Sequence, residues 1–410
     1  MEAILPRYHN VWIAPLFIFL FLFNTAFLPE GLSFSLLLTP VWLFLLYRMQ
    51  GLRYLTAFCL VLGTYMMIHL WLGVIVHYYL ISTLMLFCTG VFALTTAMIL
   101  SKDLVDLEGI FNKILILNFL LALCSIPLLL FPSIKSVVWY SMSMSDQIRV
   151  IARLKLFTSE ASHYSYLIAP LFIFYYCKAL FQRESVPWLA LFMISVPMAM
   201  SLSFGVIGCL TISGMILIGF RFRRVFNSSK KRSVLLASMG GAALVLLILF
   251  VFYRHNLFFL RIDNILNGRD TSFRGRTYES FILAHKILQQ KSLYWGIGPG
   301  QLKVFAREII IQYYFYSRIP ETIRIPNAVA ETIVCYGYIG VVLRIGLQVF
   351  LFFRTGVRKN PYRLWLFLFL FIFQFMGSYI TNAAEYVFWI LCFSNISNQL
   401  FENQLNTKVR

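Results

Sequence analysis

Charged side chains are scarce in this sequence. Only 12% of its 410 residues are Asp, Glu, Lys or Arg, whereas 60% are hydrophobic, and a soluble domain typically has about 25% charged residues. Apolar runs of about 18 or more residues recur along the chain, and each can cross the roughly 30 Å hydrocarbon layer of a membrane. This composition excludes a soluble globular domain and predicts an all-α polytopic membrane protein.

Groups of metal-binding residues are also lacking. The seven cysteines lie in apolar runs without a CxxC spacing, so neither disulfides nor a thiolate metal site is expected. His69 and His77 lack acidic companions, and no DxD pair occurs in a segment expected to face outward. The sequence therefore disfavours a metal-dependent transferase that uses nucleotide sugars, and we expect neither a metal nor another cofactor.

The hydropathy pattern predicts twelve transmembrane helices. The first apolar run is longer than the roughly 7–15 residues of a signal-peptide core, and no small-x-small cleavage site follows it. We therefore expect this run to remain as the first membrane helix. The twelve expected spans are residues 11–28, 32–47, 54–73, 76–99, 110–131, 163–181, 186–201, 203–220, 234–252, 327–352, 362–377 and 384–401.

Basic residues are distributed unevenly about these spans. If the N-terminus is cytoplasmic, more than half of the 35 Lys and Arg are cytoplasmic, and the four short loops on the other side have none. This distribution follows the positive-inside rule and predicts that both termini are cytoplasmic. The net charge of +19 therefore needs no nucleic-acid partner.

The expected parts are helices 1–5 in residues 1–131, a first periplasmic loop in 132–162, helices 6–9 in 163–252, a large periplasmic loop in 253–325, and helices 10–12 with a cytoplasmic tail in 326–410.

The large outer loop is strongly basic. Residues 254–325 include eight arginines and three lysines against five acids, and arginine binds phosphate oxygens in a bidentate manner. We expect the loop to bind a phosphate or diphosphate group, with general contact to anionic headgroups as the alternative. Gly298 and Gly300 belong to a GxGPG turn whose backbone N–H groups can approach an anion, or which only connects two helical stretches.

Two pairs of polar residues occur where helices re-enter the membrane from the outer side. Glu160 and His163 are spaced i, i+3, and Asn327 and Glu331 are spaced i, i+4, so each pair shares a helical face. Such groups can orient a sugar hydroxyl or accept its proton. The alternative is that they cap their helices and complement the helix dipoles. Arg344 lies within a span, where a charge is costly, and its role stays open.

Several short motifs stand out in the second part of the chain. They are Thr158-Ser159-Glu160-Ala161-Ser162-His163, Gly275-Arg276-Thr277, Gly296-Ile297-Gly298-Pro299-Gly300, Asn327 with Glu331, Gly337-Tyr338-Ile339-Gly340 and Met376-Gly377-Ser378-Tyr379-Ile380-Thr381-Asn382. These motifs resemble those shared by bacterial O-antigen polymerases and O-antigen ligases. The resemblance covers about residues 150–400, whereas residues 1–130 match only as generic membrane helices. A histidine precedes the asparagine in many ligases, but Pro326 stands there in this chain, which favours the polymerase branch.

This resemblance implies a metal-independent, inverting glycosyltransferase at the periplasmic face of the bacterial inner membrane. Its substrates would be undecaprenyl-pyrophosphate-linked oligosaccharides, and its partners would be membrane lipids and a chain-length regulator. Arg276, with Arg274 or Arg269, would stabilise the departing pyrophosphate. The residues that would position or deprotonate the acceptor hydroxyl are Glu160, His163 or Glu331.

Two other functions stay open at this point. An O-antigen ligase would transfer the polysaccharide to lipid A-core and would need no chain-length regulator. A flippase or secondary transporter belongs to a different class, in which repeats, broken helices and midplane charges are common. No internal repeat is visible here, and the polar residues cluster on one outer side, so a transporter is the weaker alternative.

Overall fold

The computed structural model describes residues 9–29, 31–101, 106–141, 152–182, 187–222, 257–315, 323–377 and 382–394, with a few short stretches between them. Within these ranges the chain is almost entirely helical, and the one sheet is an antiparallel pair, β1 (Trp139–Tyr140) with β2 (Arg153–Leu154). The helices are α1 His9–Phe23, α2 Phe34–Leu37, α3 Thr39–Arg48, α4 Leu52–Trp71, α5 Val76–Ser101, α6 Leu107–Ser125, η1 Pro127–Leu130, α7 Pro132–Val138, α8 Ala161–Phe181, α9 Trp188–Met200, α10 Phe204–Phe220, α13 Leu257–Leu266, α14 Thr271–Arg276, α15 Tyr278–Leu288, α16 Leu302–Phe305, α17 Arg307–Tyr314, α18 Ala328–Arg354, η2 Val357–Lys359, α19 Pro361–Phe373 and α20 Ala383–Phe393.

The prediction of an all-α chain with membrane-spanning character is confirmed at this coarse level. Five helical stretches in the described ranges are long and apolar enough to cross a membrane, namely α4, α5, α6 with η1, α8 and α18. Helices also occupy the shorter apolar runs of α1, α9, α10, α19 and α20. The expected span 32–47 is broken between α2 and α3, where Pro40 stands at the start of α3. The expected span 234–252 lies almost entirely outside the described residues.

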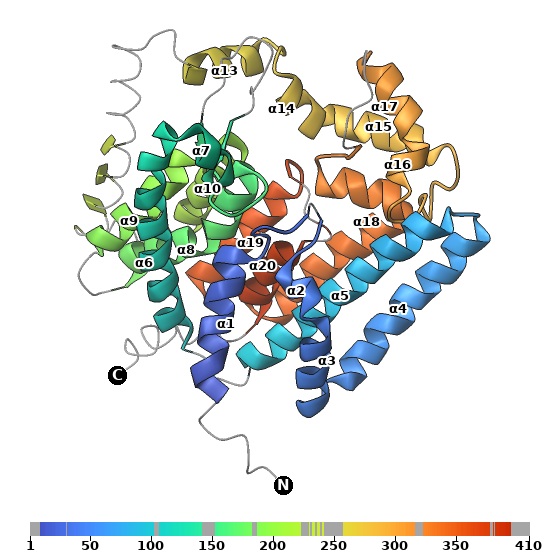
Figure 1. Cartoon of the computed structure of the whole chain (residues 1–410), viewed down its shortest axis with the longest axis horizontal. Coiled ribbons are helices and arrows are strands. Elements are labelled where there is room, and N and C mark those ends of the chain that lie inside the picture. The colour runs from blue at the N-terminus through green and yellow to red at the C-terminus, as the bar shows by residue number, and fades with distance from the viewer. Residues whose placement is uncertain are drawn as a thin grey trace.

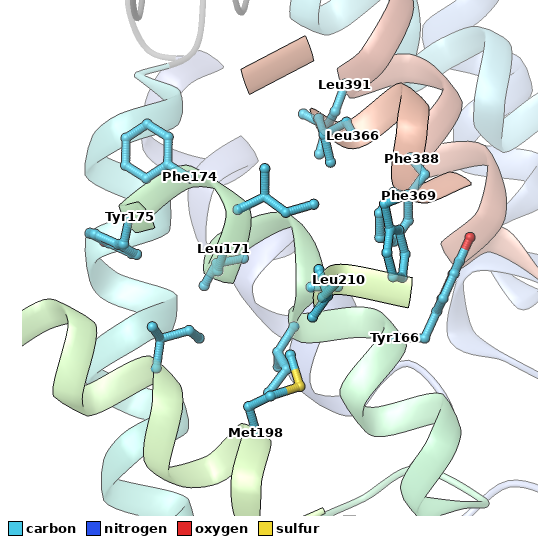
Figure 2. Packing of buried hydrophobic residues seen from close by; sticks show 14 of the residues in the cluster. Tyr166, Leu171, Phe174, Tyr175, Met198, Leu210, Leu366, Phe369, Phe388 and Leu391 are labelled. Carbon is cyan, nitrogen blue, oxygen red and sulfur yellow. The ribbon is translucent and has the colours of Figure 1, made fainter. Parts of the chain in front are cut away.

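The core is centred on α8, most of whose residues are buried. Figure 2 shows aliphatic and aromatic side chains of α8, α9, α10, α19 and α20 packed together. Tyr166 of α8 lies against Phe369, Phe373 and Phe388, with ring centroids 4.5–5.9 Å apart. Because lipid tails are as apolar as these side chains, close packing holds such helices together. This packing gives the start of α8 a rigid support.

The large basic loop is folded and lies at one end of the molecule. Figure 1 shows α13, α14, α15 and α17 along this end, together with α7, while α1 and α4 begin at the opposite end. Apolar residues of α15 and α17 pack on the first half of α18. Residues 293–298 hydrogen-bond to the backbone of α18 where Gly337 interrupts its helical geometry. The loop is therefore fixed to the membrane helices beneath it.

Candidate active site

A cavity of about 560 Å³ lies beneath this folded loop. Its walls come from the segment after α1, the segment leading into α8, the end of α14, the segment before α18 and the start of α20. The structure brings together all four residues that the sequence predicts as catalytic, since these side chains all line this cavity: Glu160, His163, Arg276 and Glu331. Their roles stay predictions, but their proximity makes one shared site possible.

Glu160 occupies the position before the first turn of α8. It does not cap the helix, because its carboxylate makes no hydrogen bond to the backbone N–H groups there. Instead, Oε2 accepts a hydrogen bond from the Ser162 hydroxyl at 2.9 Å, and Oε1 pairs with an Nη atom of Arg324 at 2.6 Å. The carboxylate is thus held on the cavity wall.

The charge of Glu160 is controlled by its neighbours. Burial acts to raise the pKa of this carboxyl, but the Arg324 guanidinium, the Ser162 hydroxyl and the more distant Arg276 together outweigh burial and hold the pKa below its ordinary value. Burial also lowers the pKa of the Lys155 ammonium, which lines the same cavity. Glu160 is therefore a stable anion in an electropositive surrounding and a poor proton acceptor.

His163 lies one turn into α8 and is buried. Its Nε2 is 3.0 Å from Nδ2 of Asn382. The Asn382 Oδ1 atom caps α20 by accepting from the backbone N–H of Ala384 at 2.9 Å, which fixes the orientation of the amide and leaves its NH₂ group to donate. Nε2 of His163 is therefore an acceptor, and the neutral ring has its proton on Nδ1. This arrangement suits a positioning role better than proton abstraction through Nε2.

Arg276 and Asn327 are joined through the turn that follows α19. Asn327 is fully buried; its Nδ2 donates to the carbonyl oxygens of Arg276 at 2.8 Å and Phe375 at 2.7 Å. Its Oδ1 caps α18 by accepting from the N–H of Ala330 at 3.0 Å. Nη1 of Arg276 in turn lies 3.5 Å from the carbonyl of Met376. Asn327, predicted as a substrate contact, thus lies outside the cavity lining and holds Arg276 in place.

Four other predicted substrate contacts lie away from the cavity lining. Arg269 is exposed, and Arg274 pairs with the buried Glu279. The N–H of Gly298 donates to the carbonyl of Cys335 at 3.0 Å, so it is used within the protein. A side chain at Gly300 would clash with the carbonyl of Tyr78. The glycine turn thus packs against α5 and α18, which corresponds to the alternative of a connecting turn.

Arg324 and Lys155 were missed as individual candidates. Arg324 is separated from Glu160 by 164 positions in the sequence, and it counted only as one of eight arginines in the loop. Its place two residues before the Pro326-Asn327 motif was the available signal. With Arg276, these residues give the cavity three cations against the two carboxylates of Glu160 and Glu331.

No group of three or more His, Cys, Asp or Glu side chains with metal-ligand spacing occurs in the part of the chain that the structure describes. No family model matches the chain, and no curated protein sequence is significantly similar to it.

Proposed function

We propose that this protein is a glycosyltransferase that polymerises lipid-linked oligosaccharide repeat units, as O-antigen polymerases do. The observation that supports this function is the single cavity that joins Glu160, His163, Arg276 and Glu331 with Arg324 and Lys155. Three cations suit a diphosphate leaving group, and a carboxylate beside them suits an acceptor hydroxyl. The reaction would take place at the periplasmic face of the bacterial inner membrane, with both termini cytoplasmic.

The cations would act on the donor. As the bond between the anomeric carbon and the diphosphate oxygen breaks, its electron pair goes to that oxygen, and the developing charge needs fixed positive groups. Arg276 and Arg324 offer planar forks that match phosphate oxygens, and Lys155 adds a third cation. Asn327 holds Arg276 in place by donating a hydrogen bond to the backbone carbonyl of Arg276. Asn327 thus positions the site, whereas the Arg276 guanidinium stabilises the charge.

Of the two carboxylates, Glu331 would act on the acceptor. The acceptor hydroxyl attacks the anomeric carbon from the side opposite the diphosphate, which inverts the configuration, and its proton passes to a base. Glu160 is held as an anion by Arg324, which makes it a weak base. We therefore propose that Glu331 accepts the proton, and that Glu160 orients the side chain of Arg324. Undecaprenyl-pyrophosphate-linked units would be the substrates, and a chain-length regulator would be the partner.

The ligase is the nearest competing function. Pro326 lines the cavity directly before the buried Asn327, at the position where many ligases have a histidine. A proline side chain can neither donate nor accept a proton. A mechanism that needs that imidazole therefore has no counterpart at this position, which supports the polymerase.

Gene deletion followed by complementation tests the proposal. Lipopolysaccharide from the deletion strain should consist of core with a single repeat unit, and wild type should restore the ladder. Arg276→Ala should fail to restore it at normal protein level, whereas Arg307→Ala, which removes an exposed arginine of the same loop, should restore it. Bare core with accumulated lipid-linked polymer would identify a ligase instead, and a full ladder with Arg276→Ala would remove the cavity from the reaction.

A further inference from the structure

A second, apolar pocket lies next to the charged cavity. It has a volume of about 100 Å³ and is formed between α1, α5, α6, α8 and α20. Almost all of its lining is aliphatic or aromatic; the polar exceptions are Asn24 and Thr96. In Figure 1, α1 lies between α6 and the short helices α2 and α3, and α20 contacts α5 and α8. The pocket therefore lies among the membrane helices, below the folded loop.

Three segments of the chain line both spaces, and at two of them the lining changes from polar to apolar within one helical turn. On α8, His163 lines the cavity and Leu167 the apolar pocket, about 6 Å further along the helix. At α20, Asn382 lines the cavity and Ala383 lines the pocket. After α1, Thr25 lines the cavity and Asn24 the pocket. The two spaces are therefore adjacent on three sides.

We propose that this apolar pocket holds the first part of the hydrocarbon chain of a polyprenyl diphosphate donor, whose diphosphate lies among the cations of the cavity. This inference rests on the proposed function and adds to it the route by which the lipid meets the site. An amphiphile with a doubly anionic head complements three cations beside an apolar pocket. Because the volume is comparable to the roughly 150 Å³ that holds one small hydrocarbon, only the head-proximal part of the chain fits, and the rest extends into the bilayer.

Photocrosslinking of the full-length protein in nanodiscs tests the location. The probe is a polyprenyl diphosphate with a diazirine on its first isoprene units, and adducts are mapped by mass spectrometry. The proposal expects adducts on pocket residues such as Ile114, Leu167 and Val387. Unlabelled polyprenyl diphosphate should compete, whereas polyprenol and phosphatidylglycerol should not.

A space-filling variant tests the same pocket by affinity. Ala384 is buried and lines the pocket, so Ala384→Leu should displace about two methylene groups of the ligand and weaken binding by about tenfold. Ala57→Leu on the exposed face of α4 makes the same chemical change away from the pocket and should leave binding unchanged. Monodisperse elution of both variants controls for folding.

The outcomes separate this proposal from the proposed function. The pocket would be rejected as the lipid site if adducts on the exposed α4 residues Leu60 and Met67 were as abundant as those in the pocket. Equal competition by phosphatidylglycerol would reject it as well. If that occurs while Arg276→Ala still abolishes the ladder, the polymerase stands and the lipid route is wrong. Pocket adducts together with bare core in the deletion strain would instead support the lipid site and reject the polymerase.

Discussion

Glu160 and Arg324 set the electrostatics of the cavity at the scale of single residues. Their side chains meet at 2.6 Å, and the guanidinium offsets the burial that would otherwise favour the protonated carboxyl. Since Arg324 is more than half exposed, the pair is partly screened by solvent and adds little to stability. The pair matters instead because Arg324 keeps the Glu160 carboxyl ionised.

Arg324→Gln should raise the pKa of Glu160. In the folded protein this pKa is held below its ordinary value of about 4.5, so the ionised pair is fully formed above that pH and is lost as the pH falls through the lowered pKa. Without Arg324 the effect of burial dominates, and the carboxyl protonates at higher pH. Infrared difference spectra of the purified protein follow the protonation of this carboxyl, and Glu160→Gln identifies its band. Arg307→Gln is the control, and an unchanged titration of Glu160 in Arg324→Gln would disprove the coupling.

The interruption of α18 is the main feature at the scale of elements. Gly337 has φ 68° and ψ −171°, and the broken helix leaves backbone groups that need partners within the protein. The N–H groups of Tyr338 and Ile339 donate to the carbonyls of Leu293 and Tyr294, at 3.0 and 3.3 Å. The loop segment 293–298 therefore replaces the missing helical hydrogen bonds.

Gly337→Ala should destabilise the protein strongly. A Cβ at this position would lie 2.1 Å from the carbonyl oxygen of Tyr294, and the backbone conformation alone costs about 1–3 kcal/mol for a residue with a side chain. Gly346→Ala in the same helix meets nothing within 4 Å and should be neutral or stabilise by roughly 0.5–1 kcal/mol. Melting temperatures in detergent compare the two variants; equal values would contradict this account of the interruption.

Arg344 connects three helices inside the molecule. It forms an ion pair with Glu385 of α20, and its Nε donates to Gln374 at 3.1 Å. Gln374 also pairs with Gln348 through two hydrogen bonds of 3.1 Å. All four side chains are buried or nearly so. The sequence left the role of Arg344 open. The structure shows that its buried charge is paired with the carboxylate of Glu385.

Removing one partner of this pair should cost more than removing both. Arg344→Met leaves the Glu385 carboxylate buried without its cation, which typically costs about 3–5 kcal/mol. The double variant Arg344→Met with Glu385→Gln leaves no isolated charge and should regain most of that stability. Thermal unfolding of the single and double variants in detergent measures the coupling, and additive losses would show that the pair contributes no mutual stabilisation.

The orientation in the membrane belongs to the scale of the whole molecule. The folded loop lies at one end, and the end of α5 lies at the other (Figure 1). The cavity is lined in part by Arg276 and Arg324 of that loop. The uneven distribution of basic residues predicts that the loop end is periplasmic. The proposed reaction on lipid-linked oligosaccharides needs this orientation.

Cysteines introduced one at a time at the two ends of the molecule should differ in their reactivity toward a membrane-impermeant maleimide. In a background without the seven native cysteines, Thr271→Cys at the exposed start of α14 should react with a membrane-impermeant maleimide in cells with a permeabilised outer membrane. Ser101→Cys at the exposed end of α5 should react only after the inner membrane is disrupted. The reverse pattern would invert the topology and exclude a periplasmic site.

The sequence by itself determined the class of the protein and most of its helices. A bilayer demands apolar helices of sufficient length with every backbone group satisfied internally, so hydropathy alone locates them. Polar pairs at two helix starts identified Glu160, His163 and Glu331 as candidates, and the resemblance of the Gly275-Arg276-Thr277 motif added Arg276. The sequence predicted that Gly298 and Gly300 contact an anion, whereas the structure packs their turn against α5 and α18. A glycine needed for close packing and a glycine that approaches an anion cannot be distinguished in the sequence.

Only the tertiary structure decided which polar residues meet. Lipid and apolar side chains are equally hydrophobic, so hydropathy contains no information about which helix faces pair. The cavity therefore gains Arg324, because packing brings it into contact with Glu160, 164 positions away in the sequence. Lys155 also lines the cavity, whereas Arg274 pairs with Glu279 only five positions along the chain. The adjacency of the charged cavity and the apolar pocket has the same origin, since α1, α8 and α20 become neighbours only in the folded molecule.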